Sequence, residues 1–550
     1  MTTLLALQPT IRVNVEYHLL WPVLIMLVGP LVVLVVSALS GRRAPGWLWP
    51  VLSVLTAAGA MAASVHDWLW TYRAPSPTRL LVLGGELAVD RFACWFFFIA
   101  CGVVAVGALT FHGYVRRERL DGPEIYVLAM LSASGAMTMA MANDLIVLFL
   151  GLEILSIALY VMAGYHRRRT QSGEAAMKYF ILGAFSSALF LYGVALTYGA
   201  TGSTHILEVR NYLVQTHEHN GLVLAGMGLL LVGLGFKVAA VPFHTWTPDV
   251  YEGSPTPVTG YMAALAKAAG FAGLLRIFAY MYVTPEIVHA WRPAVWTLAV
   301  LTLVVGAFVA LVQTDLKRML AYSSINHAGY VLVGMTAIHW ANGGLRRTNG
   351  VSSALYYLLT YAFIILGSFA VVAVVSGRGD GRTTIETVRG LSTRRPLLAL
   401  SLTVFLAAQA GVPFTTGFLA KFSVVSAAVG AHEASTYVLA VLAMLVTAVS
   451  AFFYLRVIIV MYADPGDIDS GSGDQSGAAS GADAAVAADA GETGEAPGGV
   501  TVAVATTTDT ALPVPVGTGI AIAVCLLVTV GGGLWPGPLI DAARRALLAF

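Results

Sequence analysis

Apolar residues in this chain fall into blocks of about 20 residues, separated by short polar or charged stretches. A helix of about 20 residues is long enough to cross a hydrocarbon core of about 30 Å. The pattern predicts fourteen transmembrane helices, at 18–39, 47–65, 91–113, 123–142, 144–165, 174–199, 220–246, 255–280, 293–314, 315–338, 351–376, 396–429, 435–462 and 515–538. The seventh and twelfth blocks are long and contain Pro242 and Pro413, each of which predicts a break inside its helix.

Two stretches depart from this pattern. Residues 66–90 have mixed polarity and contain Pro75 and Pro77, which predicts an extended surface loop. Residues 464–514 are rich in Gly, Ala, Ser, Asp and Thr and contain no Lys or Arg. Such a stretch buries too little apolar surface to offset its ordering entropy, so it predicts a disordered acidic loop. A plain linker is favoured there over an acidic tether with a function.

The two proline-containing blocks resemble each other in sequence. Residues 239–245 read AAVPFHT and residues 410–416 read AGVPFTT. They lie five crossings apart, so the two helices run in opposite directions, as in the inverted repeats of transporters. The pattern predicts two inverted five-helix repeats. The predicted units are N-terminal helices at 1–122, repeats at 123–281 and 292–463, the acidic loop at 464–514 and a last helix at 515–550.

The composition narrows the class of protein. Hydrophobic residues make up 58% of the chain and charged residues only 11%, whereas soluble domains carry about 25% charged residues. This excludes a water-soluble enzyme and predicts an all-α polytopic membrane protein. The net charge of +2 and the absence of a basic arm give no sign of a nucleic-acid partner. No CxxC, HExxH or nucleotide-binding loop is present, so neither a metal nor a cofactor is expected in this chain.

Loop charges predict the orientation. Loops after odd-numbered helices hold fifteen Lys and Arg residues, and the opposite side holds ten. The positive-inside rule then places the odd-numbered loops in the cytoplasm and both termini outside. The first residues lack the basic region of a signal peptide, so the first helix is expected to be retained.

The lysines are the strongest chemical clue. Four of the five lie in apolar blocks, namely Lys178, Lys237, Lys267 and Lys421. A cationic side chain at the bilayer centre costs about 2.5–3.5 kcal/mol on insertion scales, so these side chains must face the bundle interior. A buried lysine can lose its proton, whereas an arginine cannot. Lysines in these blocks therefore favour a role in proton transfer. The alternatives are lysines that only lock helix packing and, for Lys178, one that reaches the membrane interface.

Glu153 is the acidic residue that lies well inside an apolar block. Ser156 and Tyr160 lie on the same helical face, three and seven residues later. An ionised, buried carboxylate requires a cation, and Lys178 on the next helix is the best candidate. The pair would be a switch for protons or, alternatively, a static salt bridge.

Two histidines are candidates for auxiliary proton relay. His244 follows Lys237 across the Pro242 break, and His327 lies on a polar stripe with Ser323 and Tyr330. Hydrogen-bonded packing is the alternative for each. Four acidic residues at helix ends are interpreted as caps or solvated charges, namely Asp144, Asp249, Glu252 and Asp315. Together, the buried Glu, the lysines and the two helix breaks predict a proton wire.

Several segments resemble the antiporter-like membrane subunits of respiratory complex I, and among them subunit N. The resemblance rests on GLEILSIALY at 151–160, EAAMKYF at 174–180, GFKVAAVPFHTWTPDVYEG at 235–253, DLKRMLAYSSINH at 315–327 and the broken segment through Lys421. Lys421 resembles the lysine of subunits N and L. Subunit L would carry further C-terminal helices.

The resemblance implies roles for these residues. Glu153 and Lys178 would form the switching pair, Lys237 and Lys267 the central relay, and Lys421 the exit-side group. NADH, FMN, iron–sulfur clusters and quinone, which we expect to be menaquinone, would be bound by other subunits. The partners would be the other membrane and peripheral subunits of complex I and the lipid bilayer of a bacterial cell. A subunit of a multisubunit cation/proton antiporter and a non-transporting scaffold are the alternative functions.

Overall fold

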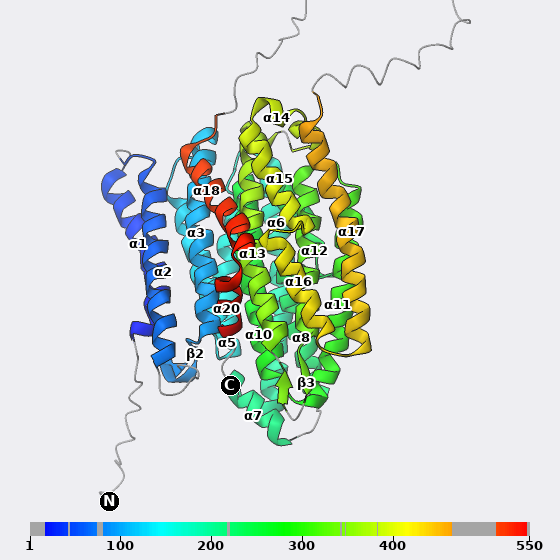
Figure 1. Ribbon diagram of the computed structural model, residues 1–550. Helices are drawn as coiled ribbons and strands as arrows, with labels where there is room; N and C mark the ends of the chain where they lie inside the picture. The colour runs from blue at the N-terminus through cyan, green and yellow to red at the C-terminus, as the bar shows by residue number, and fades with distance from the viewer. Residues whose placement is uncertain are drawn as a thin grey trace, which may run out of the picture.

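The structure is a computed structural model, and it describes residues 17–41, 44–73, 81–216, 221–341, 344–346, 348–381, 383–464 and 513–546. Helices account for nearly all of its regular structure (Figure 1). The predicted acidic loop at 464–514 lies outside the described residues except at its two ends.

The first half of the chain forms ten helices. They are α1 (Tyr17–Ser40), α2 (Leu48–Arg73), α3 (Arg91–Glu118), α4 (Glu124–Met141), α5 (Leu145–Ala163), α6 (Thr170–Thr201), α7 (Ile206–Thr216), α8 (Gly221–Val238), α9 (Trp246–Gly253) and α10 (Thr256–Arg276). A π-helical turn, Ile277–Met281, extends α10. The short strands β1 (Leu81–Val82) and β2 (Leu87–Ala88) pair antiparallel between α2 and α3.

The second half repeats this helical organisation. It contains α11 (Pro285–Leu311), α12 (Leu316–Thr336), α13 (Thr348–Val375), α14 (Leu391–Arg394), α15 (Pro396–Ala410), α16 (Thr416–Val429), α17 (Ala434–Tyr462), α18 (Val516–Leu526), α19 (Gly532–Leu534) and α20 (Gly537–Arg545). A small antiparallel hairpin, β3 (His339–Ala341) and β4 (Gly344–Arg346), precedes α13. A π-helical turn, Leu527–Gly531, joins α18 to α19.

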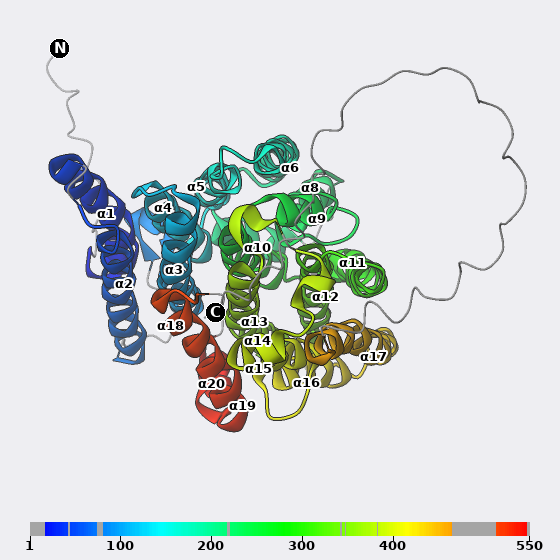
Figure 2. The same cartoon turned by 90° about the horizontal axis from the view of Figure 1, so that it is seen from above.

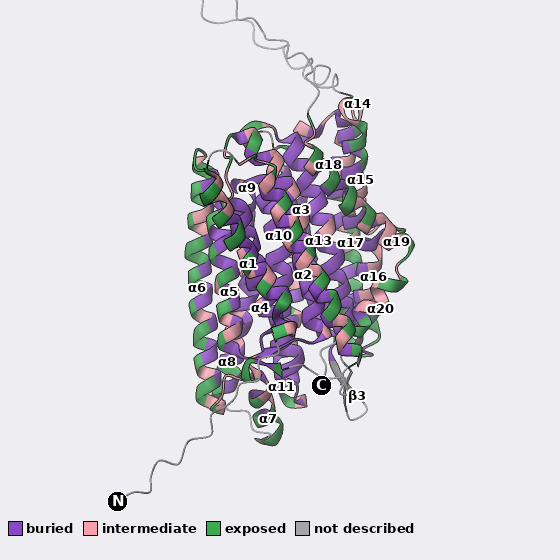
Figure 3. Ribbon diagram, turned by 90° about the vertical axis from the view of Figure 1, so that its left-hand side faces the viewer, coloured by how far each residue is buried: buried purple, intermediate pink, exposed green. Residues whose placement is uncertain are grey.

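The predicted helical membrane architecture is confirmed. Within the described ranges, twelve helices are long and apolar enough to cross a membrane. The more polar α12 and the broken pair α15–α16 account for the other two predicted crossings. At the centre of the bundle, α10 is buried at every residue, and Figure 2 shows it surrounded by other helices. Exposed residues lie mainly along the outer helices (Figure 3).

The prediction of a surface loop at 66–90 was wrong in part. Helix α2 continues to Arg73, and residues 81–88 form the first hairpin. The falling hydropathy reflects Asp67, whose side chain is fully buried beside His66 at 3.3 Å. Asp67 is therefore a second acidic residue inside a long apolar helix, which the sequence analysis had not recognised.

Both predicted helix breaks are present. α8 ends at Val238 and α9 begins at Trp246, while α15 ends at Ala410 and α16 begins at Thr416. Equivalent neighbours pack in the two halves, since α4 contacts α5 as α11 contacts α12, and α6 contacts α8 as α13 contacts α15. The fold therefore contains two five-helix repeats, each with one proline-broken helix.

Candidate functional site

Each helix break is occupied by a lysine from a neighbouring segment. The last carbonyl groups of a helix have no intrahelical partner and carry partial negative charge. Lys267 Nζ donates to the Val238 carbonyl at the end of α8 (3.2 Å) and to the Ser324 carbonyl on α12 (2.9 Å). Lys421 Nζ donates to the Ala410 carbonyl at the end of α15 (3.2 Å). The breaks therefore create the polar acceptors that these buried ammonium groups need.

The chain turns sharply at both breaks. Ala239 has a φ of 60° and Gly411 a φ of 95°, both in the left-handed region. Glycine adopts this region without a steric penalty. A Cβ atom at position 411 would lie 3.2 Å from Cδ of Lys421, so a side chain there would crowd the lysine. Gly411 thus allows both the turn and the close approach of Lys421.

Lys237 lies at the end of α8 and is 3% exposed. Its Nζ donates to Ser156 Oγ on α5 (2.8 Å) and to the Tyr179 hydroxyl on α6 (3.5 Å). The ring of Tyr160 lies 5.7 Å from the same nitrogen. The polar face of α5 predicted from the sequence thus receives Lys237.

Glu153 is half-buried on α5 and lies close enough to Lys237 to act on it electrostatically. Its Oε1 atom is buried and has no hydrogen-bond partner among the described residues. The sequence-based interpretation paired this carboxylate with Lys178. In this structure the Lys178 ammonium group instead bonds to the carboxylates of Glu174 and Asp249, and its pairing with Glu153 stays a prediction.

Lys178 forms two ion pairs near the start of α6. Its Nζ lies 2.8 Å from Glu174 Oε1, one turn earlier on the same helix, and 2.8 Å from Asp249 Oδ2 on α9. Its side chain is 42% exposed. Asp249 lies in the first turn of α9 and is partly exposed, as expected for a residue at a helix end, and it is in addition the ion-pair partner of Lys178. Asp144 and Asp315 do cap α5 and α12, as predicted.

A polar cluster on α12 lies between Lys267 and Lys421. His327 Nδ1 lies 2.5 Å from the Tyr357 hydroxyl, and Nε2 lies 3.2 Å from the Tyr454 hydroxyl. Ser323 Oγ donates to Gln409 Oε1 at 3.0 Å, at the end of α15. His327 interacts electrostatically with both lysines. The histidine predicted from the polar stripe is therefore hydrogen-bonded to α13 and α17 within the second repeat.

His244 is not part of this polar cluster. It lies between the Pro242 break and α9, and its buried Nδ1 has no hydrogen-bond partner within the described part of the chain. Among the described residues, no hydrogen bond joins it to Lys237 or Lys267. Its auxiliary role remains a prediction.

A buried ionic cluster was missed by sequence reasoning. Lys317, counted among the loop charges in the sequence, is fully buried and donates to the carbonyl groups of Glu252 (2.8 Å) and Ser254 (2.6 Å). Asp380, between α13 and α14, accepts from Arg169 at 3.0 Å and from the backbone N–H of Thr256 at 3.1 Å. Burial alone would raise the pKa of the Asp380 carboxyl, but Lys317 and Arg169 hold it below its usual value.

A second buried ion pair lies at the other end of α10. Both terminal nitrogens of Arg276 bond to the carboxylate of Asp90 at 2.8 Å, and both side chains are almost fully buried. The two residues lie at the ends of apolar blocks, where the sequence gives no sign that they meet.

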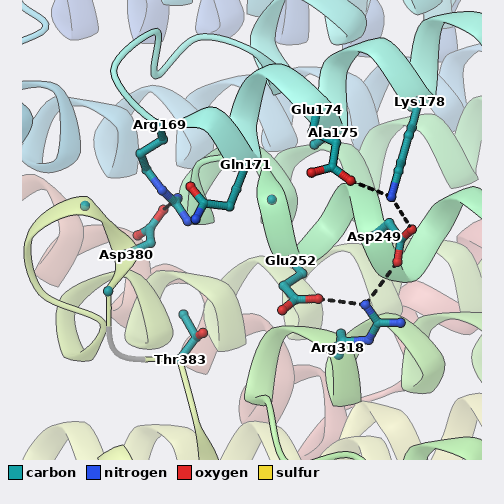
Figure 4. Close-up of a pocket in the computed structure, with 13 residues that line it drawn as sticks. Arg169, Gln171, Glu174, Ala175, Lys178, Asp249, Glu252, Arg318, Asp380 and Thr383 are labelled. Atoms are coloured by element: carbon teal, nitrogen blue, oxygen red, sulfur yellow. Dashed lines mark hydrogen bonds and ion pairs between the residues drawn. The ribbon is translucent and has the colours of Figure 1, made fainter.

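A charged cavity of about 540 Å³ opens beside Lys178 (Figure 4). Its walls come from the start of α6, from α9, from the start of α12 and from the segment around Asp380. Arg318 bridges two carboxylates that line the cavity, because its Nη1 lies 3.0 Å from Asp249 and 2.7 Å from Glu252. The cavity is large enough to hold water next to the Lys178 ion pairs.

One group of potential metal ligands occurs elsewhere in the described part of the chain. Glu86, Asp144 and His205 bring one ligand atom each within 4.8 Å of one another. The Asp144 carboxylate is already the cap of α5 and accepts the Thr204 hydroxyl. Helix capping therefore accounts for its position.

Comparison with known proteins defines the class. The NADH:quinone oxidoreductase/Mrp antiporter transmembrane family matches residues 142–450, more than half of the chain. The chain belongs to this family of antiporter-like membrane subunits. Within it, the chain is 42% identical to NADH-quinone oxidoreductase subunit N of Trichlorobacter lovleyi over 456 residues, covering 82% of this chain and 89% of the relative. The chain therefore belongs to the subunit N family.

Other relatives agree. NADH-quinone oxidoreductase subunit N of Mycobacterium tuberculosis is 47% identical over 346 residues, 62% of each chain. A chain of respiratory complex I from Thermus thermophilus with bound aureothin superposes with a TM-score of 0.70 and 32% identity, over 95% of this chain and 99% of that one. A chain of the Mrp complex from Dietzia has a TM-score of 0.75 at 18% identity, over 96% of this chain and 97% of that one, which shows a shared fold. The resemblance seen in the sequence motifs is confirmed.

Proposed function

We propose that this chain is the proton-translocating subunit N of a bacterial NADH–quinone oxidoreductase. The other membrane and peripheral subunits of complex I would be its partners, and they would bind NADH, FMN, the iron–sulfur clusters and quinone. The excess of positive loop charge would place the α14 end of the bundle in the cytoplasm and the α7 end outside; these ends lie opposite each other (Figure 1). Both termini would then be on the outer side.

The observation that carries this proposal is the environment of Lys237, Lys267 and Lys421. All three are buried, and none forms an ion pair with a carboxylate in the described ranges. Their partners are neutral hydroxyl and carbonyl oxygens. An ion-paired lysine is held charged, and removing one partner of such a buried pair is strongly destabilising. A lysine with only neutral acceptors can exist in both protonation states, which a proton relay requires.

The proposed path runs through both repeats. Lys237 and the acceptor of Lys267 are adjacent, since that acceptor is the Val238 carbonyl. The second acceptor of Lys267 is Ser324, next to Ser323 of the His327 cluster. Gln409, which accepts from Ser323, precedes Ala410, the acceptor of Lys421. Neighbouring residues thus connect each lysine to the next, and water can bridge the intervals between polar groups.

Glu153 and Lys178 would regulate this path from its entry. We propose that Lys178 moves between the Asp249–Glu174 side, where it lies here, and Glu153, whose Oε1 has no partner in the part of the chain described. Pairing with Lys178 would weaken the field of Glu153 at Lys237. Release of Lys178 toward the charged cavity would restore that field and favour proton uptake by Lys237.

The test is proton pumping by the assembled complex in inverted membrane vesicles. Lys237→Ala should reduce NADH-driven acidification at least tenfold, while the complex still assembles. Lys237→Arg should fail as well, because arginine keeps its proton. Arg389→Ala is a matched control, since it removes a cation that pairs with exposed Glu386. Unchanged pumping in Lys237→Ala would overturn the relay, and sodium-dependent transport would favour a cation/proton antiporter.

A further inference from the structure

An apolar groove runs along the outer surface between α15 and α18. It encloses about 940 Å³, and its walls include Leu397, Leu400 and Val404 on α15 and Ile522, Ala523 and Leu526 on α18. Figures 1 and 3 show these two helices side by side toward the α14 end of the bundle. Nothing in the proposed proton path involves this groove.

Arg395 lines the end of the groove next to α14. Its Nε atom is buried and has no hydrogen-bond partner among the described residues. The neighbouring Arg394 differs, since its Nη2 donates to the carbonyl groups of Thr387 (3.3 Å) and Arg389 (2.7 Å). Arg395 therefore brings a positive charge and an unused donor to the mouth of an otherwise apolar groove.

Both helices begin at this mouth. α15 starts at Pro396 and α18 at Val516. A helix N-terminus carries a partial positive charge, which favours an anion, although Pro396 itself offers no N–H group. The groove thus has one electropositive end and apolar walls.

The length of the groove matches one leaflet of a membrane. On α15 the lining runs from Pro396 to Val404, about 12 Å at 1.5 Å per residue, and on α18 and its π-helical turn from Gly519 to Val530, about 17 Å. Half of a hydrocarbon core is about 15 Å.

We propose that this groove binds one anionic phospholipid, with its phosphate at Arg395 and an acyl chain between α15 and α18. Basic residues between transmembrane helices on the cytoplasmic side favour anionic headgroups. The apolar walls take the chain of the same lipid. The site is independent of the proton path, so either proposal can fail alone.

The experiment uses the assembled complex in phosphatidylcholine vesicles that contain a photoactivatable phosphatidylglycerol or, separately, a photoactivatable phosphatidylcholine. Adducts are mapped by mass spectrometry to residues 395–404 and 516–530. Phosphatidylglycerol should label these segments more than phosphatidylcholine. Arg395→Gln should lower the labelling by phosphatidylglycerol about fivefold, which is the effect expected of one basic residue near an anionic membrane surface. Arg394→Gln should leave this labelling nearly unchanged.

A second variant tests the acyl chain. Ala523→Phe places a large side chain in the groove and should reduce labelling by both lipids, with assembly monitored by native electrophoresis. Equal labelling by the two lipids would mean ordinary boundary lipid and would overturn the proposal. Labelling insensitive to Arg395→Gln, or cross-links from the groove to another polypeptide, would overturn it as well. Competition by inorganic phosphate alone would show a free-anion site and would also contradict it.

Discussion

Two regions of the bundle bury charged side chains in opposite ways. Around Asp380 and along the Arg276–Asp90 contact, the buried cations lie beside a carboxylate, because Arg169 and Lys317 share Asp380 and Arg276 bonds to Asp90. In the row from Lys237 to Lys421, the hydrogen-bond acceptors of the buried ammonium groups are neutral oxygens. A buried ion pair is most stable when both of its groups stay charged. Lys237, Lys267 and Lys421, whose acceptors are neutral, can change their charge. The fold thus separates the residues that hold helices together from those proposed to carry protons.

The largest expected effect is loss of the Asp380 carboxylate. Asp380→Ala leaves Arg169 and Lys317 without their shared counter-ion in a buried site. Breaking a buried ion pair by removing one member costs about 3–5 kcal/mol, which is comparable with the total stability of many domains. The variant should fail to assemble, or should unfold at a markedly lower temperature in detergent. Normal assembly would show that the cluster does not lock the helices.

The same carboxylate should make stability depend on acid pH. The pKa of Asp380 is lower in the folded protein than in an unfolded chain, where an aspartate titrates at about 4. Its contribution is therefore complete above the unfolded value and is lost as pH falls through the lower folded value. Asp380→Asn should flatten this part of the stability profile, measured as the unfolding temperature between pH 7 and acid pH. An unchanged profile would exclude Asp380 as the titrating group.

Loss of Lys267 should affect activity and not assembly, in contrast to loss of Asp380. Lys267→Ala removes a donor to two carbonyl groups and leaves no unpaired carboxylate. Assembly should therefore be retained, while pumping and coupled NADH–quinone turnover fall at least tenfold. A stable variant that pumps normally would place Lys267 among the packing residues and would remove the distinction between the two regions.

Glu153 and Lys178 could belong to either region, as a static ion pair or as part of the proton path. Glu153→Gln should stall transfer, whereas Glu153→Asp should retain part of the activity because it keeps the charge at a shorter reach. Lys178→Met should also reduce pumping, and it leaves Asp249 with its second cation, Arg318, at 3.0 Å. The informative variant combines Glu153→Gln with Lys178→Met. Full activity in the double variant would indicate a static pair, and a stable, inactive protein would support the switch.

Local sequence patterns predicted the membrane helices well because hydropathy and helix-breaking prolines act within one segment. The breaks at Pro242 and Pro413 and the burial of Lys237, Lys267 and Lys421 follow from such signals. The partners of these residues required the tertiary fold. Lys178 meets Asp249, 71 residues later, because the break redirects α9.

The missed clusters have the same explanation. Asp380 and Arg169 are 211 residues apart, and Arg276 and Asp90 are 186 residues apart. Each of these charges lies at the edge of an apolar block, where hydropathy alone indicates a solvated position. Only the packing of α3, α6 and α10 with distant segments takes them out of water.

The smallest expected effect concerns an ion pair of the same chemistry at the surface. Arg389 Nε lies 2.8 Å from Glu386 Oε2, and the glutamate side chain is 60% exposed. Exposed pairs contribute about 0–1 kcal/mol, because water already solvates both charges. Glu386→Gln should therefore leave assembly, pumping and the unfolding temperature close to those of the unaltered protein, in contrast to Asp380→Asn. A loss as large as that of the Asp380 variant would show that burial is not what distinguishes the two pairs, and that the loop around α14 has a contact of its own in the assembled complex.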